Sequence, residues 1–221
     1  MAAKKATGKK KMTREAIISS YMNAVLENEH TPKSVYKFCK DHEMSEDDFY
    51  QFFGSFDGLR KEIWNGFFDH TLELTHKANG FDTFNNKEKM LTFFFTFFEL
   101  LTVNRSYALF SLKEHKNPLQ SMEQLKGLRG RVKEFAGELI EDKNDEKQIK
   151  LLKQPVSVFS EGAWLQLLFI LKYWMEDSSP GFEKTDLVIE KSVRAIFDVF
   201  DTAPLESVLD FGKFLWKEKM N

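Results

Sequence analysis

The spacing of the first helical segments limits the possible folds of this chain more than any other feature. Residues 13–28, 31–42 and about 45–53 carry apolar side chains at helical intervals, and short polar breaks separate them. A residue that favours helix N-termini opens each segment: Thr13, Thr31 and Ser45. Because only about three residues separate the second segment from the third, the sequence predicts a helix-turn-helix.

The remainder of the chain is also predicted to be helical. Helix-breaking residues are scarce, with 11 Gly and 5 Pro against 23 Phe in 221 residues. One long helix is expected over residues 119–142, and a final helix from residue 204 to about 219. The most apolar runs, 90–101 and 163–174, are shorter than the ~20 residues of a membrane span. We therefore expect an all-α protein without a membrane span, with a three-helix N-terminal domain before a larger helical bundle.

Residues at matching intervals in the first part of the chain carry a family pattern. They are Thr31 and Val35, Ser45, Phe49 and Tyr50, Phe53 and Leu59. In these positions the chain resembles the TetR-type transcriptional repressors over about 50 residues. The resemblance implies a helix-turn-helix DNA-binding domain over residues 13–58 and a ligand-binding and dimerisation domain over 59–221. It also implies a homodimer through the helices near 156–175 and 183–200, operator DNA, and an apolar small-molecule effector.

The chain departs from that family pattern in the helix-turn-helix itself. Glu43 occupies the turn position where the family usually has Gly, which tolerates a left-handed backbone. Three acids, Glu46 to Asp48, open the third helix, where small or polar residues usually face DNA. Phe52 follows the aromatic pair in place of His or Tyr, and Phe56 stands where a Lys usually meets a phosphate.

Charge gives no general argument for nucleic acid, since the net charge is −2. Residues 33–64 contain five basic and seven acidic side chains. An acid ~6 Å from a phosphate repels it by about 0.7 kcal/mol in water and about 3 kcal/mol at an effective dielectric near 20. The acids also have a structural interpretation, because Ser45 and Asp48 are spaced as a capping box.

The basic tail, residues 1–12, is expected to be disordered, and it can either solubilise the protein or lie along a phosphate backbone. The candidate DNA-binding residues combine this tail with the second and third helices. They are Lys4, Lys5, Lys9, Lys10, Lys11, Lys33, Ser34, Ser45, Tyr50 and Gln51.

No catalytic or metal-binding motif is found in the sequence. The five His residues are scattered, and HExxH, CxxC, GxSxG and glycine-rich phosphate loops do not occur. The single cysteine, Cys39, excludes an internal disulfide and is expected to be a small buried residue. The chain is therefore predicted to be a cytoplasmic protein that is not an enzyme and has no cofactor or metal site.

Aromatic residues concentrate in two helical segments, 93–98 and 159–174. They can form an ordinary core, or some can line an apolar cavity between helices. The candidate pocket residues are Phe94, Phe97, Phe98, Tyr107, Phe110, Phe159, Trp164 and Leu168.

Two functions are consistent with these features. The first is a TetR-like regulator whose effector shifts the spacing of two helix-turn-helix heads. The alternative is a lipid-binding or apolar-ligand-binding protein on the same fold that does not bind DNA, which the acidic third helix and Phe56 favour.

Overall fold

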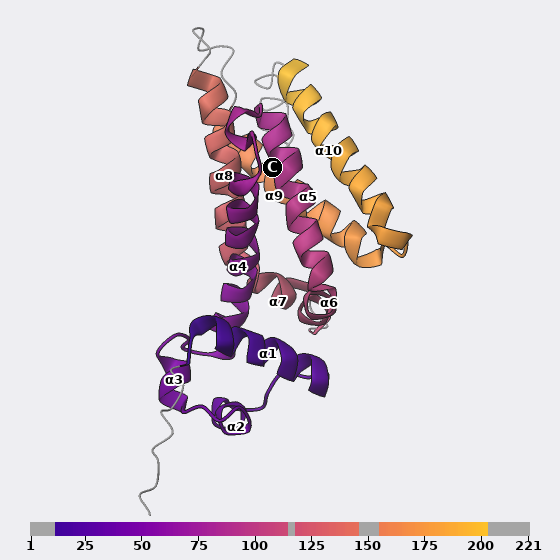
Figure 1. The fold of residues 1–221 in the computed structure, drawn as a ribbon. Helices are drawn as coiled ribbons and strands as arrows, with labels where there is room; N and C mark the ends of the chain where they lie inside the picture. Colours follow the sequence, from indigo (N-terminus) through magenta and orange to yellow (C-terminus); the bar gives the residue numbers. More distant parts are fainter. Residues whose placement is uncertain (1–11, 115–117, 146–154, 203–221) are drawn as a thin grey trace, which may run out of the picture. The chain divides into compact units, whose positions relative to one another are not determined.

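A computed structural model describes residues 12–114, 118–145 and 155–202. This part of the chain is all-α, as the sequence predicted, and contains no strand (Figure 1). The helices are α1 Arg14–Asn28, α2 Val35–Asp41, α3 Glu46–Tyr50, α4 Phe56–Lys77, α5 Asn86–Val103, α6 Arg105–Lys113, α7 Pro118–Glu123, α8 Lys126–Asp145, α9 Val156–Glu176 and α10 Glu183–Thr202, with 3₁₀ turns η1 Phe81–Thr83 and η3 Pro180–Phe182. The helix expected over 204–219 lies outside the described residues.

The first three helices begin at side-chain caps. The Thr13 hydroxyl accepts a hydrogen bond from the amide of Ala16, as the sequence predicted for α1. The second helix begins later than expected, because Ser34 rather than Thr31 caps it and accepts from the amide of Lys37. The Thr31 hydroxyl instead donates to the carboxylate of Glu114, a partner 83 residues away.

The helix expected over residues 119–142 is two helices, α7 and α8. The break falls at Gln124 and Leu125, both of which are buried. The Gln124 side-chain amide donates to the carbonyls of Ser111 (2.8 Å) and Ser121 (3.0 Å), and its oxygen accepts from the Trp64 indole N–H (3.1 Å). These contacts fix the chain at a point where nothing in the local sequence stops a helix.

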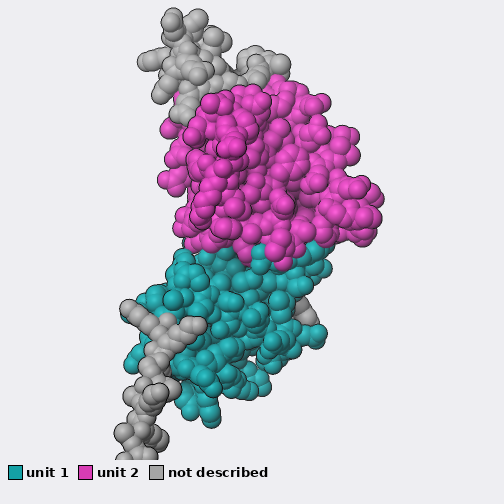
Figure 2. Space-filling view, in the orientation of Figure 1, with its two compact units in different colours: residues 1–64, 104–126 teal, residues 65–103, 127–221 magenta. Residues whose placement is uncertain are grey.

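The described helices form two compact units, coloured separately in Figure 2. The first unit gathers residues 1–64 with 104–126, so α6 and α7 pack with the N-terminal helices. The second unit gathers residues 65–103 with 127–221, and in it α10 packs on α5 and α9. Within the described residues no helix combines the length and apolar character needed to cross a bilayer.

Each unit has an aromatic core of its own. In the first unit, Tyr21, Phe38, Phe49 and Trp64 are almost fully buried. In the second, Phe93, Phe94 and Phe97 on α5 and Trp174 on α9 are completely enclosed. Full burial of such a side chain contributes roughly 1.5–3 kcal/mol, which explains why each unit is held together without a disulfide.

Candidate functional site

Residues 42–45 connect α2 to α3 in a tight turn. The amide of Met44 donates to the carbonyl of Cys39 (3.0 Å), and the Met44 side chain is buried beneath the turn. Glu43, at the tip, has a φ of 54°, which is the left-handed conformation that glycine adopts more easily. The turn therefore keeps the backbone shape for which glycine is favoured, at a cost of about 1 kcal/mol.

The three acids at the start of α3 have different environments. The amide of Asp48 donates to the Ser45 hydroxyl (3.1 Å), and the amide of Ser45 donates to the Asp48 carboxylate (3.0 Å). This pair is the capping box that the sequence predicted. Glu46 and Asp47 are exposed. Only these two of the three therefore present their carboxylates freely to solvent.

Cys39 lies below the same turn and is buried, as predicted. Burial, together with smaller contributions from the nearby carboxylates of Glu46 and Asp48, raises the pKa of its thiol to about 11. A thiol with so high a pKa is mostly protonated at neutral pH, which makes it a packing residue rather than a nucleophile.

Basic and aromatic side chains alternate along the outer surface of α2 and the residues just before it. Lys33, Lys37 and Lys40 are exposed there. Tyr36 is 63% exposed, and Tyr50, on α3, is 52% exposed. Positions 36, 37 and 40 follow the spacing of one face of α2, so Tyr36, Lys37 and Lys40 lie on the same side of the helix, and Lys33 lies just before its N-cap. We call the exposed side chains of Lys33, Tyr36, Lys37, Lys40, Tyr50 and Gln51 the α2–α3 face.

Phe56, at the start of α4, is part of the core of the first unit. Its ring stacks on Tyr21 at 5.4 Å, and the rings of Phe38 and Phe49 meet it edge-on at 5.6 and 5.5 Å. Aromatic pairs in this geometry each contribute about 0.5–1.5 kcal/mol beyond their buried area. Its presence is therefore explained by packing, and it carries no information about phosphate binding.

Several charges near the start of α4 are paired within the first unit. The Arg60 guanidinium donates to Glu114 at 2.7 Å and also contacts Asp57. Lys61 pairs with Glu123 at 2.9 Å, and Arg14 pairs with Glu62. Because these charged side chains after position 56 are paired with one another or with other residues of the first unit, they do not count toward the net charge of the α2–α3 face. That balance depends on the three lysines against the exposed acids Asp41, Glu43, Glu46 and Asp47.

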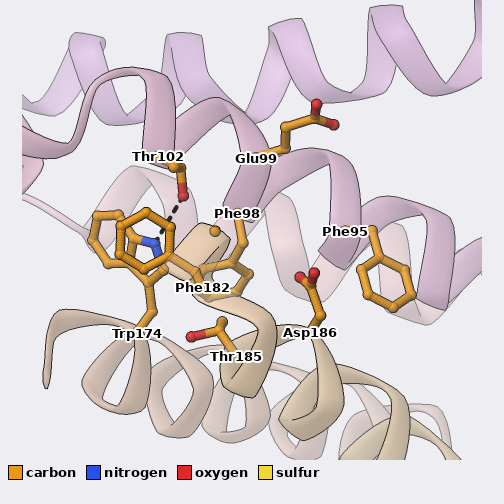
Figure 3. A pocket seen from close by; sticks show the side chains of 9 residues that line it. Phe95, Phe98, Glu99, Thr102, Trp174, Phe182, Thr185 and Asp186 are labelled. Atoms are coloured by element: carbon orange, nitrogen blue, oxygen red, sulfur yellow. Dashed lines mark hydrogen bonds between the residues drawn. The ribbon is translucent and has the colours of Figure 1, made fainter. Parts of the chain in front are cut away.

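A cavity of about 350 Å³ opens into the second unit (Figure 3). Its walls come from the second half of α5, the last part of α9, η3 and the start of α10. The lining residues are Phe95, Phe98, Glu99, Thr102, Trp174, Gly181, Phe182, Thr185 and Asp186. The Trp174 indole N–H donates to the Thr102 hydroxyl at 3.0 Å, which fixes the indole against α5. Cavities of this size accommodate small organic molecules.

Asp177 fixes the segment that forms one end of the cavity. Its carboxylate accepts from the amide and hydroxyl of Thr185 (2.9 and 2.7 Å) and from those of Ser179 (2.8 and 2.7 Å). Burial alone would raise the pKa of Asp177, but these hydrogen bonds lower it to about 2. The carboxylate thus stays ionised at neutral pH and satisfies amides at the start of α10.

A known protein family matches more than half of the chain. The family model described as "Tetracyclin repressor-like, C-terminal domain" matches residues 89–215, more than half of the 221 residues. The chain belongs to the tetracycline repressor-like family. Its all-α architecture is the TetR-like fold. No match was found among curated proteins.

The candidate DNA-binding residues of this TetR-like chain are distributed over three settings. Lys33, Tyr50 and Gln51 are exposed, whereas Ser34 and Ser45 serve as N-caps. The tail residues Lys4, Lys5, Lys9, Lys10 and Lys11 lie outside the described residues. Tyr36 was not among the candidates. Its two-residue offset from the buried Phe38 places it on the opposite side of α2, and that signal was available in the sequence.

The candidate pocket residues are divided between the two units. Phe94, Phe97, Phe159 and Trp164 are buried in the second unit, where Leu168 is half-buried. Phe98 lines the cavity. The remaining two are in the first unit, where Phe110 is half-buried and Tyr107 packs edge-on against Tyr21 at 6.5 Å. The other lining residues come from the same half of α5 as Phe98 and from residues 174–186, and none of them was among the candidates.

Proposed function

We propose that this TetR-like protein is a DNA-binding transcriptional regulator controlled by a small molecule bound in its second unit. The family match over residues 89–215 is the observation that carries the proposal. It is supported by a compact set of short helices, α1–α3, that precedes the matched region. In this proposal residues 13–58 form the DNA-binding domain, and residues 59–221 form the ligand-binding and dimerisation domain.

The α2–α3 face is the surface that we expect to meet DNA. It offers lysines for phosphates, and Tyr50 and Gln51 for groove contacts. Ser34 and Ser45 would support this surface by capping α2 and α3. The basic tail would contribute additional phosphate contacts and offset Glu46 and Asp47.

A gel-shift experiment with the DNA upstream of the protein's own gene tests the proposal. Retention should fall steeply with salt. Lys33→Ala should weaken it for all sequences and reduce the salt slope by about one unit, because one phosphate contact is lost. Lys113→Ala, an exposed lysine on α6, serves as the matched control and should retain DNA normally. Absence of retention at low salt with any genomic fragment would refute DNA binding.

The two exposed acids of α3 provide a sharper test. If α3 approaches DNA, the double change Glu46→Gln and Asp47→Asn removes two repulsive charges and should tighten binding about 10- to 1,000-fold. The same pair of changes should not alter the melting temperature by more than about 1–2 °C, since both side chains are exposed. Unchanged DNA affinity would mean that α3 does not face the duplex.

We propose that two copies of the chain associate through α9 and α10. Leu165 and Phe169, four residues apart on α9, are 63% and 57% exposed, and Val199 on α10 is 53% exposed. Apolar side chains exposed on neighbouring helices favour burial against a partner, here a second copy as the family implies. Phe169→Glu should therefore convert a dimer to a monomer in sedimentation velocity, whereas Val103→Glu, which alters an exposed apolar residue on α5, should not.

The alternative of a lipid carrier that does not bind DNA is not retained. It relied on the acidic third helix and on Phe56. Phe56 is explained by its contacts with three rings, and Asp48 by the capping box. Glu46 and Asp47 remain, and the charge-removal experiment addresses them directly.

A further inference from the structure

The cavity of the second unit has a mixed lining. Aromatic rings of Phe95, Phe98, Trp174 and Phe182 contribute apolar surface, but two carboxylates, Glu99 and Asp186, are part of the same wall. In Figure 3 the Asp186 carboxylate is seen between the Phe95 ring and the group formed by Phe98, Phe182 and Trp174. A purely apolar ligand would leave these charges without a partner, and its binding free energy would be less favourable because the charges are partly desolvated.

Neither carboxylate is neutralised by another residue that the structure describes. Both residues are exposed, and no Lys, Arg or His of the described residues lies within ion-pair distance of either one. Partial burial raises the pKa of Asp186, and repulsion from Glu99 raises it further, followed by smaller contributions from Asp177 and Glu183. The cavity therefore has an excess of negative charge that a bound cation would relieve.

Helix ends add to the negative potential. Thr102 lies in the last turn of α5, Glu99 lies just before that turn, and Trp174 lies in the last turn of α9. The C-terminal end of a helix carries a partial negative charge of about half an electron. The opposing N-terminal end of α10 is already satisfied, since Asp177 accepts the amide of Thr185. Among the described helices that line the cavity, none therefore offers a free N-terminus with which to attract an anion.

The aromatic wall is held in an unusual backbone conformation. Gly181 and Phe182 have φ angles of 62° and 61°. Glycine adopts this conformation freely, but a bulky residue in it is strained. The strained turn brings the Phe182 ring to the cavity, where Trp174 and Phe98 also lie (Figure 3). Aromatic faces attract organic cations when the charge lies within about 6 Å of the ring centre.

We propose that the cavity binds an organic cation, specifically an ammonium group attached to an aromatic or alkyl body. The rings would surround the apolar body and the alkylated ammonium, and Glu99 and Asp186 would balance its charge. This assignment rests on the proposed function, in which the cavity holds the effector, and it replaces a neutral apolar effector with a charged one. A metal ion is a poor fit, because the described residues offer no group of three or more His, Cys, Asp or Glu placed to hold one.

Isothermal titration calorimetry with two probes of the same shape tests the charge requirement. Benzyltrimethylammonium is the cation, and neopentylbenzene is its neutral isostere. The full-length protein should bind the cation at least tenfold more tightly, a difference of about 1.4 kcal/mol at 25 °C. Equal affinity for both probes, tighter binding of the neutral probe, or no binding of the cation up to millimolar concentration would overturn the proposal.

Three variants separate the role of charge from the role of the rings. Glu99→Gln with Asp186→Asn should weaken the cation at least tenfold and leave the neutral probe unchanged. Phe182→Ala should weaken both probes, because it removes a ring that both would contact. Glu134→Gln, an exposed acid on α8, is the control. If it weakens the cation as much as the cavity variants do, the attraction is a general effect of surface charge and the proposal fails.

The two proposals fail independently. Cation binding that depends on Glu99 and Asp186, in a protein that never retains DNA, would refute the regulator and leave the cavity assignment standing. Retention of DNA without charge-selective binding would refute the cavity assignment alone. Circular dichroism and the melting temperature of each variant establish that it is folded before its affinity is compared.

Discussion

The left-handed turn at Glu43 yields the most direct prediction from this structure, because its magnitude can be worked out from one dihedral angle. With φ at 54°, Glu43 occupies a conformation that costs an L-residue roughly 1–2 kcal/mol. Replacement by Gly removes that cost. It also gives the unfolded chain more freedom, which offsets about 0.4–1 kcal/mol of the gain. The side chain is exposed and makes no hydrogen bond or ion pair with the described residues, so its removal costs no other stabilising interaction among them.

Glu43→Gly should therefore stabilise the protein by about 0.5–1 kcal/mol, which corresponds to a melting temperature about 1–4 °C higher. The measurement is thermal unfolding followed by circular dichroism at fixed protein concentration, since association with a partner copy would change the midpoint. Two further glutamates at the C-terminal end of α1, one in its last turn and one at its C-cap, provide controls. Glu29, with φ at 56°, should respond to Gly in the same direction as Glu43. Glu27, inside the helix, should lose about 1 kcal/mol.

The test depends on whether each of the three glycine substitutions raises or lowers the free energy of unfolding. If Glu43→Gly and Glu27→Gly both destabilise to a similar extent, the turn does not hold a left-handed residue at position 43. The reasoning on this turn, and on why glycine is favoured there in the resembling repressors, would then be wrong.

Three other changes have expected outcomes in urea or acid unfolding. Asp177→Asn should lower the free energy of unfolding by about 1–2 kcal/mol at neutral pH, because the cap at α10 is weakened. The pKa of Asp177 in the folded protein, about 2, is below its value in the unfolded chain. The stability advantage of the wild type is therefore present above about pH 4 and should disappear as the pH falls toward 2. Phe56→Ala should cost about 2–3 kcal/mol, less than a fully buried Phe, since the ring is half-buried. Gly127→Ala should cost about 1–3 kcal/mol, because a Cβ there would overlap the side chain of Asn65.

Each of these changes has a control at a residue of the same type. Phe52→Ala, at a residue 37% exposed beside the same cluster, should cost under about 1 kcal/mol. Gly130→Ala, in α8 like Gly127 but with open space around it, should be neutral or stabilise by up to about 1 kcal/mol. Asp82→Asn, at a highly exposed side chain, should leave the acid-unfolding curve unchanged. Equal effects of Gly127→Ala and Gly130→Ala would contradict the packing described for α8.

Local chemistry was sufficient to predict the fold class and much of the first unit. Thr13 caps α1, and Ser45 with Asp48 forms a capping box, because a cap depends only on residues within one turn of helix. The left-handed backbone at position 43 was indicated by the resemblance, because the related repressors usually have Gly there. The family that the first part of the chain resembles is also the family whose C-terminal model matches residues 89–215, and that match does not cover the helix-turn-helix.

Tertiary structure decided the features that depend on contacts between residues distant in sequence. Thr31 is engaged by Glu114, so Ser34 starts α2 instead, and the contacts of Gln124 divide what the sequence presented as one helix. In the sequence, Phe56 was interpreted as the loss of a lysine that usually meets a phosphate. In the structure its role is packing, because it contacts three rings from α1, α2 and α3. The cavity depends on α5, α9 and α10 packing together, and hydrophobic periodicity indicates which face of a helix is buried but not which other helices enclose it.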